Sequence, residues 1–355
     1  MEKIKQFLKR KNIEISAKRY GVDALGAMAQ GLFASLLIGT IVGTLGTQLS
    51  IEAFVTVGNF AKETHVVGAA MACAIGWALQ CPPLVLFSLI TVGAATNELG
   101  GAGGPLAVLI ITVIAAELGK AVSKETKIDI LVTPFVTIFS GSMLAVLFAP
   151  VIGSAASSLG NVIIWATDLQ PFVMGILISV LVGIALTLPI SSAAICAALG
   201  LTGLAGGAAV AGCSAQMIGF AVMSFKENGV SGLISQGIGT SMLQMPNIVR
   251  NPRIWIPPTL ASAITGPIAT CIFKLQMNGA PVSSGMGTCG LVGQIGVYTG
   301  WIAPTNQASA ITPSIANWIG LILISFVLPA ILSVVFCTVL RKIGWIKEND
   351  LKLDN

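Results

Sequence analysis

Long apolar runs alternate along this chain with short clusters of charged residues, and this pattern predicts membrane-spanning helices. Runs such as 106–118 are apolar at all positions but Thr112 and Glu117, with none of the regular polar alternation of an amphipathic strand. A spanning helix needs roughly 20 apolar residues, so the chain has room for about ten spans. In the first half the expected spans cover residues 24–49, 65–79, 84–95, 105–122 and 131–152.

The second half has clear apolar spans at 172–188 and 315–340, but the sequence between them is interrupted by polar segments. These are TLPISSAA at 187–194, GIGTSMLQMPN at 237–247 and GAPVSSGMGTCG at 279–290. We call them the first, second and third break. An unpaired backbone N–H or C=O in hydrocarbon costs several kcal/mol, so irregular chain at membrane depth is tolerated only beside protein or a wet cavity. The breaks therefore predict a solute site.

Composition agrees with a membrane protein. Hydrophobic residues make up 55% of the chain and charged residues only 9%, and the mean hydropathy is +0.90. Such a chain would expose far too much apolar surface as a water-soluble domain. The predicted fold class is an all-α, polytopic integral membrane protein.

The charges predict the topology. Basic residues that precede the first span are Lys3, Lys5, Lys9, Arg10, Lys11, Lys18 and Arg19. Basic residues also gather at 120–129 and just after the last span, so the positive-inside rule places both termini in the cytoplasm. The net charge of +5 is explained by these clusters, and nucleic acid is not an expected partner. Residues 2–18 are predicted to form an amphipathic helix at the membrane surface.

Four regions are predicted. Residues 1–20 form the amphipathic basic segment, 21–168 an N-terminal transmembrane bundle, 169–345 a C-terminal transmembrane bundle and 346–355 a cytoplasmic tail. The boundary between the bundles is placed in 153–168, which is rich in Ser and Gly and lacks Lys and Arg.

Few other residues suggest chemistry. Seven cysteines occur singly in apolar context, as expected for small buried side chains: Cys73, Cys81, Cys196, Cys213, Cys271, Cys289 and Cys337. Glu117 is expected to pair with Lys120 or reach the membrane surface. His65 is interpreted as an interfacial residue and Glu98 as a loop carboxylate. No metal site, cofactor or catalytic residue is predicted.

None of the three breaks contains a charged side chain, whereas an ion pathway normally includes buried Asp, Glu or Arg. A shared cavity formed by the breaks would suit a neutral or weakly charged solute. The alternative is that each break is an ordinary loop or proline kink whose backbone groups are satisfied by neighbouring helices.

Two stretches carry a family resemblance: GGPLAVLIITVIAAELGKAVSKETKIDILVTPFVTIFSGSMLAVLFAPVIG at 103–153 and GIGTSMLQMPNIVRNPRIWIPPTLASAITGPIA at 237–269. In these the chain resembles the enzyme IIC membrane component of the bacterial phosphotransferase system, especially its fructose-like branch and the perfringolysin-regulator-like group. The resemblance implies a homodimer in the bacterial cytoplasmic membrane. It also implies dimerisation through the N-terminal bundle, and a C-terminal bundle with re-entrant hairpins that carries the sugar by a rigid-body movement.

Carried over by position, the resemblance places the solute-binding residues in the three breaks. They are Thr187, Ser191, Ser192, Ser241, Gln244, Asn247, Ser283 and Ser284. Relatives that phosphorylate their sugar typically have a glutamate shortly before the proline matching Pro246, where this chain has Met242. They also have a histidine in the hairpin where this chain has PVSSG at 281–285. General-base help is commonly worth about 10²–10⁴-fold in rate, so coupled phosphorylation is in doubt.

Three functions stay open at this stage. The first is a permease for a small neutral sugar or polyol, without coupled phosphorylation and without enzyme activity of its own. The second is a membrane sensor or regulator that keeps the binding fold and has lost transport. The third is a phosphorylation-coupled permease served by separate IIA and IIB proteins.

Overall fold

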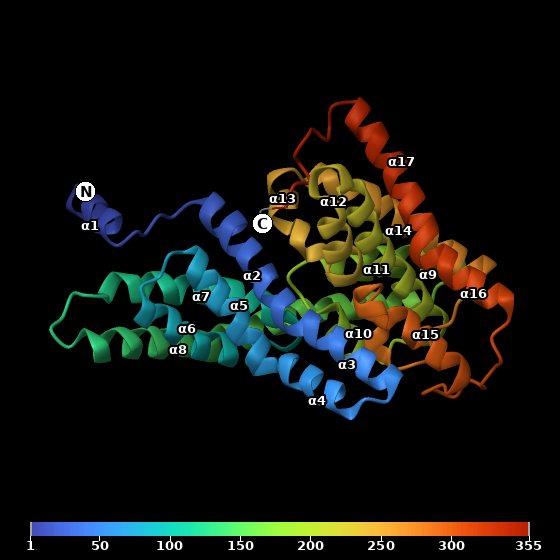
Figure 1. The fold of residues 1–355 in the computed structure, drawn as a ribbon, viewed down its shortest axis with the longest axis horizontal. Helices are drawn as coiled ribbons and strands as arrows, with labels where there is room; N and C mark the ends of the chain where they lie inside the picture. The colour runs from blue at the N-terminus through green and yellow to red at the C-terminus, as the bar shows by residue number, and fades with distance from the viewer. Residues whose placement is uncertain (1, 354–355) are drawn as a thin grey trace. The chain divides into compact units, whose positions relative to one another are not determined.

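The computed structural model describes residues 2–353, which are mostly helical, and this part of the chain contains no named strand. The predicted all-α membrane class is confirmed. The chain divides into two compact units, unit 1 (Met1–Ala156) and unit 2 (Ser157–Asn355), which are described separately below. Figure 1 shows the helices of both.

Unit 1 has helices at the expected spans, together with α1 and with α4, which was not expected as a span. Their bounds are α1 (Glu2–Arg10), α2 (Leu25–Leu32), α3 (Ile38–Leu49), α4 (Glu52–Ala61), α5 (Thr64–Ala78), α6 (Pro83–Gly100), α7 (Gly104–Val122) and α8 (Asp129–Thr167). Short π-helical segments at Arg19–Ala24 and Phe33–Leu37 join α2 and α3 into one apolar stretch, Arg19–Leu49.

The chain reverses between α6 and α7, which pack against each other. Gly101 sits at this turn with φ +49°, a conformation that glycine adopts without strain. Proline stands in the first turn of both helices, where its missing N–H leaves no helical hydrogen bond unmade. The turn therefore separates two helices of 18 and 19 residues, where the sequence predicted two separate spans at 84–95 and 105–122.

Two expectations for unit 1 need correction. The N-terminal helix ends at Arg10 and does not reach residue 18, because Asn12 has a left-handed φ of +54° that stops the helix. Residues 153–168, expected as a connector, continue α8 as far as Thr167, and the division between the units falls inside this helix. The Ser154 hydroxyl donates to the carbonyl of Pro150, one helical turn earlier, at 2.9 Å, so this polar side chain is satisfied within the helix.

The buried charges of unit 1 form one cluster. Lys120 is only 1% exposed, and its Nζ lies 2.8 Å from Glu117 and 3.2 Å from the carbonyl oxygen of Leu79. The Tyr20 hydroxyl donates to the other oxygen of Glu117 at 3.0 Å. The predicted pairing of Glu117 with Lys120 is confirmed.

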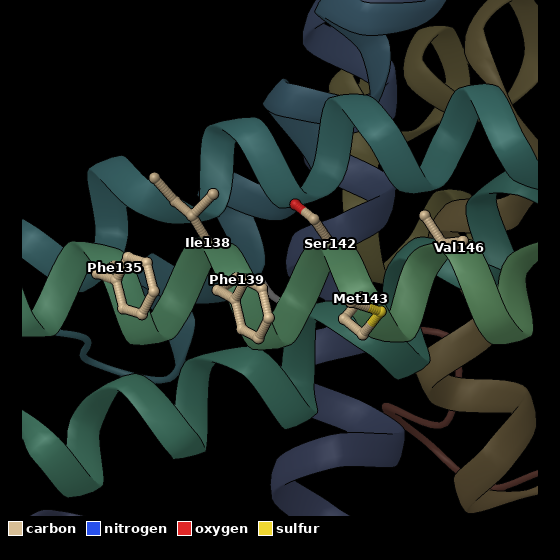
Figure 2. A pocket seen from close by; sticks show the side chains of 6 residues that line it. All are labelled: Phe135, Ile138, Phe139, Ser142, Met143 and Val146. Carbon is tan, nitrogen blue, oxygen red and sulfur yellow. The ribbon is translucent and has the colours of Figure 1, made fainter.

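Helix α8 has a wide apolar face with a shallow hollow of about 450 Å³ (Figure 2). It is lined by Phe135, Ile138, Phe139, Ser142, Met143 and Val146. The rings of Phe135 and Phe139 are stacked with centroids 5.6 Å apart, and both side chains are more than half exposed. Such a face suits contact with lipid chains.

Unit 2 is built from shorter helices. Their bounds are α9 (Pro171–Thr187), α10 (Ser192–Ala198), α11 (Gly203–Met223), α12 (Phe225–Ile234), α13 (Met245–Arg250), α14 (Ile256–Pro267), α15 (Val292–Ile302), α16 (Ile315–Ile322) and α17 (Leu328–Lys342). A π-helical segment, Leu323–Val327, joins α16 to α17 into one continuous helix of 28 residues. Figure 1 shows this helix in orange and red.

Helix α11 is the core of unit 2, and nearly all of its residues are buried. Its glycines allow backbone to approach backbone. A Cβ at Gly207 would lie 1.8 Å from the carbonyl oxygen of Leu275, and one at Gly212 would lie 1.8 Å from that of Ser179. Small residues at such contacts are typical of helices packed within a membrane.

Among residues 2–353, five helical stretches are long and apolar enough to cross a membrane, by length and composition. They are Arg19–Leu49, Pro83–Val122, Asp129–Thr167, Gly203–Met223 and Ile315–Lys342. Shorter apolar helices, α5 and α9, accompany them. The chain is therefore a multi-pass membrane protein, and the number of about ten spans stays a prediction.

Candidate functional site

The first break meets both of the others. At the end of α9 the Thr187 Oγ1 lies 2.8 Å from the Oγ of Ser241, which belongs to the second break. The Ser192 hydroxyl, at the start of α10, donates to the carbonyl of Gly285 in the third break at 2.7 Å. Residues almost 100 positions apart in the sequence are thus brought into contact.

The second and third breaks also touch. The Thr288 hydroxyl donates to the carbonyl of Gly237 at 2.5 Å, and both groups are buried. Since each pair of breaks shares a hydrogen bond, the three form one polar region inside unit 2. They are not separate loops.

Proline and glycine explain why the chain is irregular here. Leu188 precedes Pro189 and is extended, with ψ +157°, because a residue before proline is driven away from helical angles. Gly287 has φ +53°, and a Cβ on it would lie 2.6 Å from the Cβ of Cys213. The third break therefore approaches α11 as closely as glycine allows.

A buried glutamine of α11, not predicted from the sequence, lies at the centre of the polar region. Gln216 is fully buried, and its Oε1 accepts a hydrogen bond from the Trp255 indole N–H at 2.9 Å. The Oε1 of Gln216 also lies 3.3 Å from the Thr187 hydroxyl. The Nε2 of Gln216 donates to the hydroxyl of Thr259 at 3.2 Å. We call Thr187, Ser241 and Gln216 the inner cluster. The sequence signal was a single amide within an otherwise small and apolar helix.

The predicted serines near the third break are mainly engaged with backbone. Ser191 caps α10 by accepting from the N–H of Ala194 at 3.1 Å. The Ser284 hydroxyl donates to the carbonyl of Leu201 at 2.6 Å. Ser283 is buried against Gly296, where an added Cβ would meet it at 2.4 Å. These contacts hold the irregular chain in place.

Gln244 and Asn247 face a different group from Thr187. The Gln244 Nε2 donates to the carbonyl of Leu351 at 2.9 Å and to the Oε1 of Gln236 at 2.9 Å. The Asn247 Nδ2 donates to the carbonyl of Lys352 at 2.8 Å and to the Oε1 of Gln244 at 2.8 Å. We call Gln236, Gln244 and Asn247 the tail cluster, because two of its amides hold the C-terminal tail.

The tail itself is docked onto unit 2 as far as residue 353. Leu351 and Ile346 are buried, at 0% and 2% exposed, and the indole of Trp345 lies under the guanidinium of Arg253 at 5.2 Å. Asn228 donates to the carbonyl of Leu351 at 2.8 Å. The last two residues of the predicted tail, 354–355, lie outside the described residues.

Gln294 in α15 was also missed. Its Nε2 donates to the hydroxyl of Ser214 on α11 at 3.2 Å. The Gln294 residue is only 8% exposed, and its Oε1 is buried without a hydrogen-bond partner among residues 2–353. A buried acceptor without a donor is unusual, and a hydroxyl of a bound solute would satisfy it.

The side chains of the three breaks are neutral, and one charged neighbour, the guanidinium of Arg250, donates to the Oδ1 of Asn247 at 3.1 Å. The buried carboxylate of Glu227 bonds to Arg341 at 2.5 Å, and no ion pair within 2–353 includes a residue of the three breaks. Nor does this part of the chain contain a group of three His, Cys, Asp or Glu side chains placed to hold a metal. Hydroxyls and amides can bind a polyhydroxy solute, but they supply no general base.

Comparison with known proteins identifies the family of the chain. The family described as "Phosphotransferase system, EIIC" matches residues 22–353, which is nearly the whole chain. No curated protein and no solved structure matches the chain. The EIIC family comprises the membrane transport components of sugar phosphotransferase systems, which work with IIA and IIB components. The chain belongs to the phosphotransferase system EIIC family and is a sugar-type, multi-pass membrane permease.

Proposed function

We propose that the chain transports a small neutral sugar or polyol, which binds where the three breaks meet. One observation carries this proposal: side-chain hydrogen bonds link every pair of breaks around the buried helix α11. Irregular backbone at membrane depth is typical of solute sites in transporters, where freed backbone groups and polar side chains contact the solute.

The chemistry of the region supports a neutral solute. Thr187 and Ser241 offer hydroxyls that both donate and accept, and Gln294 offers an acceptor without a protein partner. A buried charge would instead demand a charged partner or a large pKa shift, and the breaks present none. Neutral amides and hydroxyls match the alternating donors and acceptors of a polyol.

We propose that transport proceeds without phosphorylation of the solute at this site. Met242 stands where phosphorylating relatives have a glutamate, and it is buried at 3% exposed. A thioether can neither accept a proton from a sugar hydroxyl nor orient one strongly. Phosphorylation-coupled transport with IIA and IIB proteins is the rival within the same family.

A sensor is the second candidate, and the docked tail favours it. Amides of the second break hold the carbonyls of Leu351 and Lys352, so a movement of that break would reach the C-terminus directly. Regulation through the tail needs no net transport. The homodimer, the cytoplasmic orientation of both termini and the bacterial cytoplasmic membrane remain predictions from the sequence.

Uptake of radiolabelled sugars and polyols into proteoliposomes tests the proposal. Wild-type protein is compared with and without phosphoenolpyruvate, the general phosphotransfer proteins and candidate IIA and IIB partners. Uptake without any phosphoryl donor is the expected result. Uptake that depends strictly on the donor would establish the coupled permease, and binding without uptake would establish the sensor.

A further inference from the structure

Unit 2 contains a cavity of about 200 Å³ that is separate from the inner cluster. It lies between the segment 273–278, the end of α15 and the loop 303–314 that leads into α16. Its aromatic lining comes from Phe273 and Trp301, and its polar lining from Lys274, Gln276, Asn278, Ser309 and Asn317. A volume below the roughly 300–1,000 Å³ of drug-sized sites suits one small solute.

Amide groups in the lining have hydrogen-bonding capacity to spare. The Gln276 Oε1 accepts from Asn278 at 3.1 Å, and the Asn317 Oδ1 accepts from the backbone N–H of Ser314 at 2.9 Å. Both amide nitrogens, and the ammonium of Lys274, have no hydrogen-bond partner within the described part of the chain. The two amide oxygens are thus held by the protein, whereas the donors, of which Lys274 and Gln276 are exposed to solvent, can exchange water for a ligand.

An aromatic wall accompanies these donors. Trp301 lines the cavity and is held by Trp318, with ring centroids 5.2 Å apart in an edge-to-face arrangement. The ring of Tyr298 also packs on Trp318, with centroids 5.6 Å apart. The electron-rich face of an indole attracts polarised C–H groups. Indole and amide donors together match a sugar or polyol, which carries C–H faces and hydroxyl edges.

The loop over the cavity is anchored to the protein. The backbone N–H of Thr305 donates to the carbonyl of Asn278 at 2.8 Å, and its hydroxyl donates to Gly279 at 2.8 Å. The N–H of Ile311 donates to the carbonyl of Trp301 at 2.7 Å. Gly279 is the first residue of the third break, so the cavity adjoins the proposed transport site.

The position along the membrane follows from the last long helix. The cavity is at the N-terminal end of Ile315–Lys342, and the docked tail follows its C-terminal end. A helix of 28 residues is about 42 Å long at 1.5 Å per residue. This length crosses the roughly 30 Å hydrocarbon core even with a tilt of about 40°. Cavity and tail therefore lie toward opposite ends of this long apolar helix.

We propose that this cavity is a second saccharide site, on the membrane side opposite the tail, where solute is held next to the third break before transport. The ligand class is a single neutral sugar or polyol. This inference rests on the proposed function, whose solute it would supply.

Fluorine NMR of the full chain in lipid nanodiscs, labelled with 5-fluorotryptophan, tests both sites at once. The chain has six tryptophans, so single Trp→Phe variants assign every resonance. Trp301 reports the cavity, and Trp255, whose N–H bonds to Gln216, reports the inner cluster. The probes are fructose, glucose, mannitol and, as an anion, inorganic phosphate.

A matched pair of loop variants gives the control. Ser309 lines the cavity and its neighbour Ala310 does not, and both residues are exposed. Ser309→Phe fills the cavity without removing any of the hydrogen bonds that anchor the loop, whereas Ala310→Phe adds the same ring outside the cavity. We expect at least one saccharide to shift the Trp301 resonance. Its apparent affinity should fall by about tenfold or more in Ser309→Phe and stay unchanged in Ala310→Phe.

The outcomes separate the two sites. A saccharide that shifts Trp255 and not Trp301 would overturn the second site and leave the proposed function standing. A shift of Trp301 alone, lost in Ser309→Phe, supports the second site and counts against the inner cluster. A Trp301 shift caused by phosphate and by no saccharide would show an anion site and overturn the inference, as would no shift at all.

Discussion

The two units of this protein differ in how their backbone N–H and C=O groups are satisfied within the membrane. Unit 1 uses long helices, the longest being Asp129–Thr167, which satisfy their own backbone groups. Its buried charges are confined to one cluster around Lys120 and Glu117. Unit 2 breaks its helices three times and satisfies the freed groups with neutral hydroxyls and amides. We therefore propose that a neutral solute binds in unit 2 and not in unit 1.

The largest expected effect is a loss of stability when a glycine at a tight helix–helix contact of unit 2 is replaced. Gly212→Ala in unit 2 would place a Cβ 1.8 Å from the carbonyl oxygen of Ser179, which is backbone and cannot move aside. Overpacking of this kind should cost about 3 kcal/mol or more and prevent folding at normal yield. Size-exclusion profiles and thermal unfolding in detergent measure it.

Gly43→Ala in unit 1 is the matched control. Its Cβ would meet its nearest neighbour at 3.7 Å, an ordinary contact, inside helix α3. Alanine in a helix interior should keep or raise stability by about 0.5–1 kcal/mol. Equal yields and melting temperatures for the two variants would contradict the tight packing assigned to α11.

The second largest effect is expected from replacing Gln216, the residue of the inner cluster that contacts Thr187, Thr259 and Trp255. Gln216→Leu leaves the indole N–H of Trp255 and the hydroxyl of Thr187 without their common acceptor. A buried group left unpaired costs about 1–3 kcal/mol, so uptake should fall by about tenfold or more. Initial uptake rates in proteoliposomes measure this loss, with Ile218→Val on the same helix as the control. Unchanged uptake would remove Gln216 from the site.

A smaller effect is expected from the tail cluster. Gln244→Ala or Asn247→Ala should weaken solute affinity by about threefold to tenfold while expression stays intact, because each loses hydrogen bonds worth about 1 kcal/mol. A chain truncated after residue 346 separates direct from indirect action. If Gln244 acts through the tail, truncation and Gln244→Ala give the same loss and are not additive. Unchanged affinity in both amide variants would exclude them from the site.

The smallest effect concerns pH and belongs to unit 1. Hydrogen bonds from Lys11, with the nearby charge of Arg10, hold the pKa of the Glu125 carboxyl below its usual range. A carboxyl with a lowered folded-state pKa contributes stability above its ordinary pKa and loses it as pH falls through the lowered value. A spin label on α1 should therefore become more mobile at acidic pH, and Glu125→Gln should be mobile throughout. Mobility independent of pH in the wild type would contradict this contact.

Much of the fold was predictable because apolar run length specifies a spanning helix so directly. The runs at 65–79 and 105–122 became α5 and α7 within a residue or two. The extent of α8 was not predictable, since Ser and Gly at 153–168 lower hydropathy without preventing helix. The one sequence sign that the N-terminal helix stops at Arg10 was Asn12, a residue type that readily adopts the left-handed conformation.

For the candidate site, proline and polar residues located the breaks, but not the partner of each side chain. Ser241 contacts Thr187, whereas Gln244, three residues after Ser241, donates to the carbonyl of Leu351 in the tail. Such directions depend on the tertiary path, which local sequence does not specify. Gln216 and Gln294 were missed because a single amide in an apolar helix is a weak signal until its neighbours are known.

A reversible cross-link between the first two breaks tests the central claim most directly. Thr187→Cys and Ser241→Cys are combined in a chain whose seven native cysteines are replaced, since the two hydroxyl oxygens are 2.8 Å apart. We predict that oxidation forms a disulfide and stops solute uptake, and that reduction restores it. Failure to cross-link, or full uptake by the cross-linked protein, would contradict a shared solute site at these breaks.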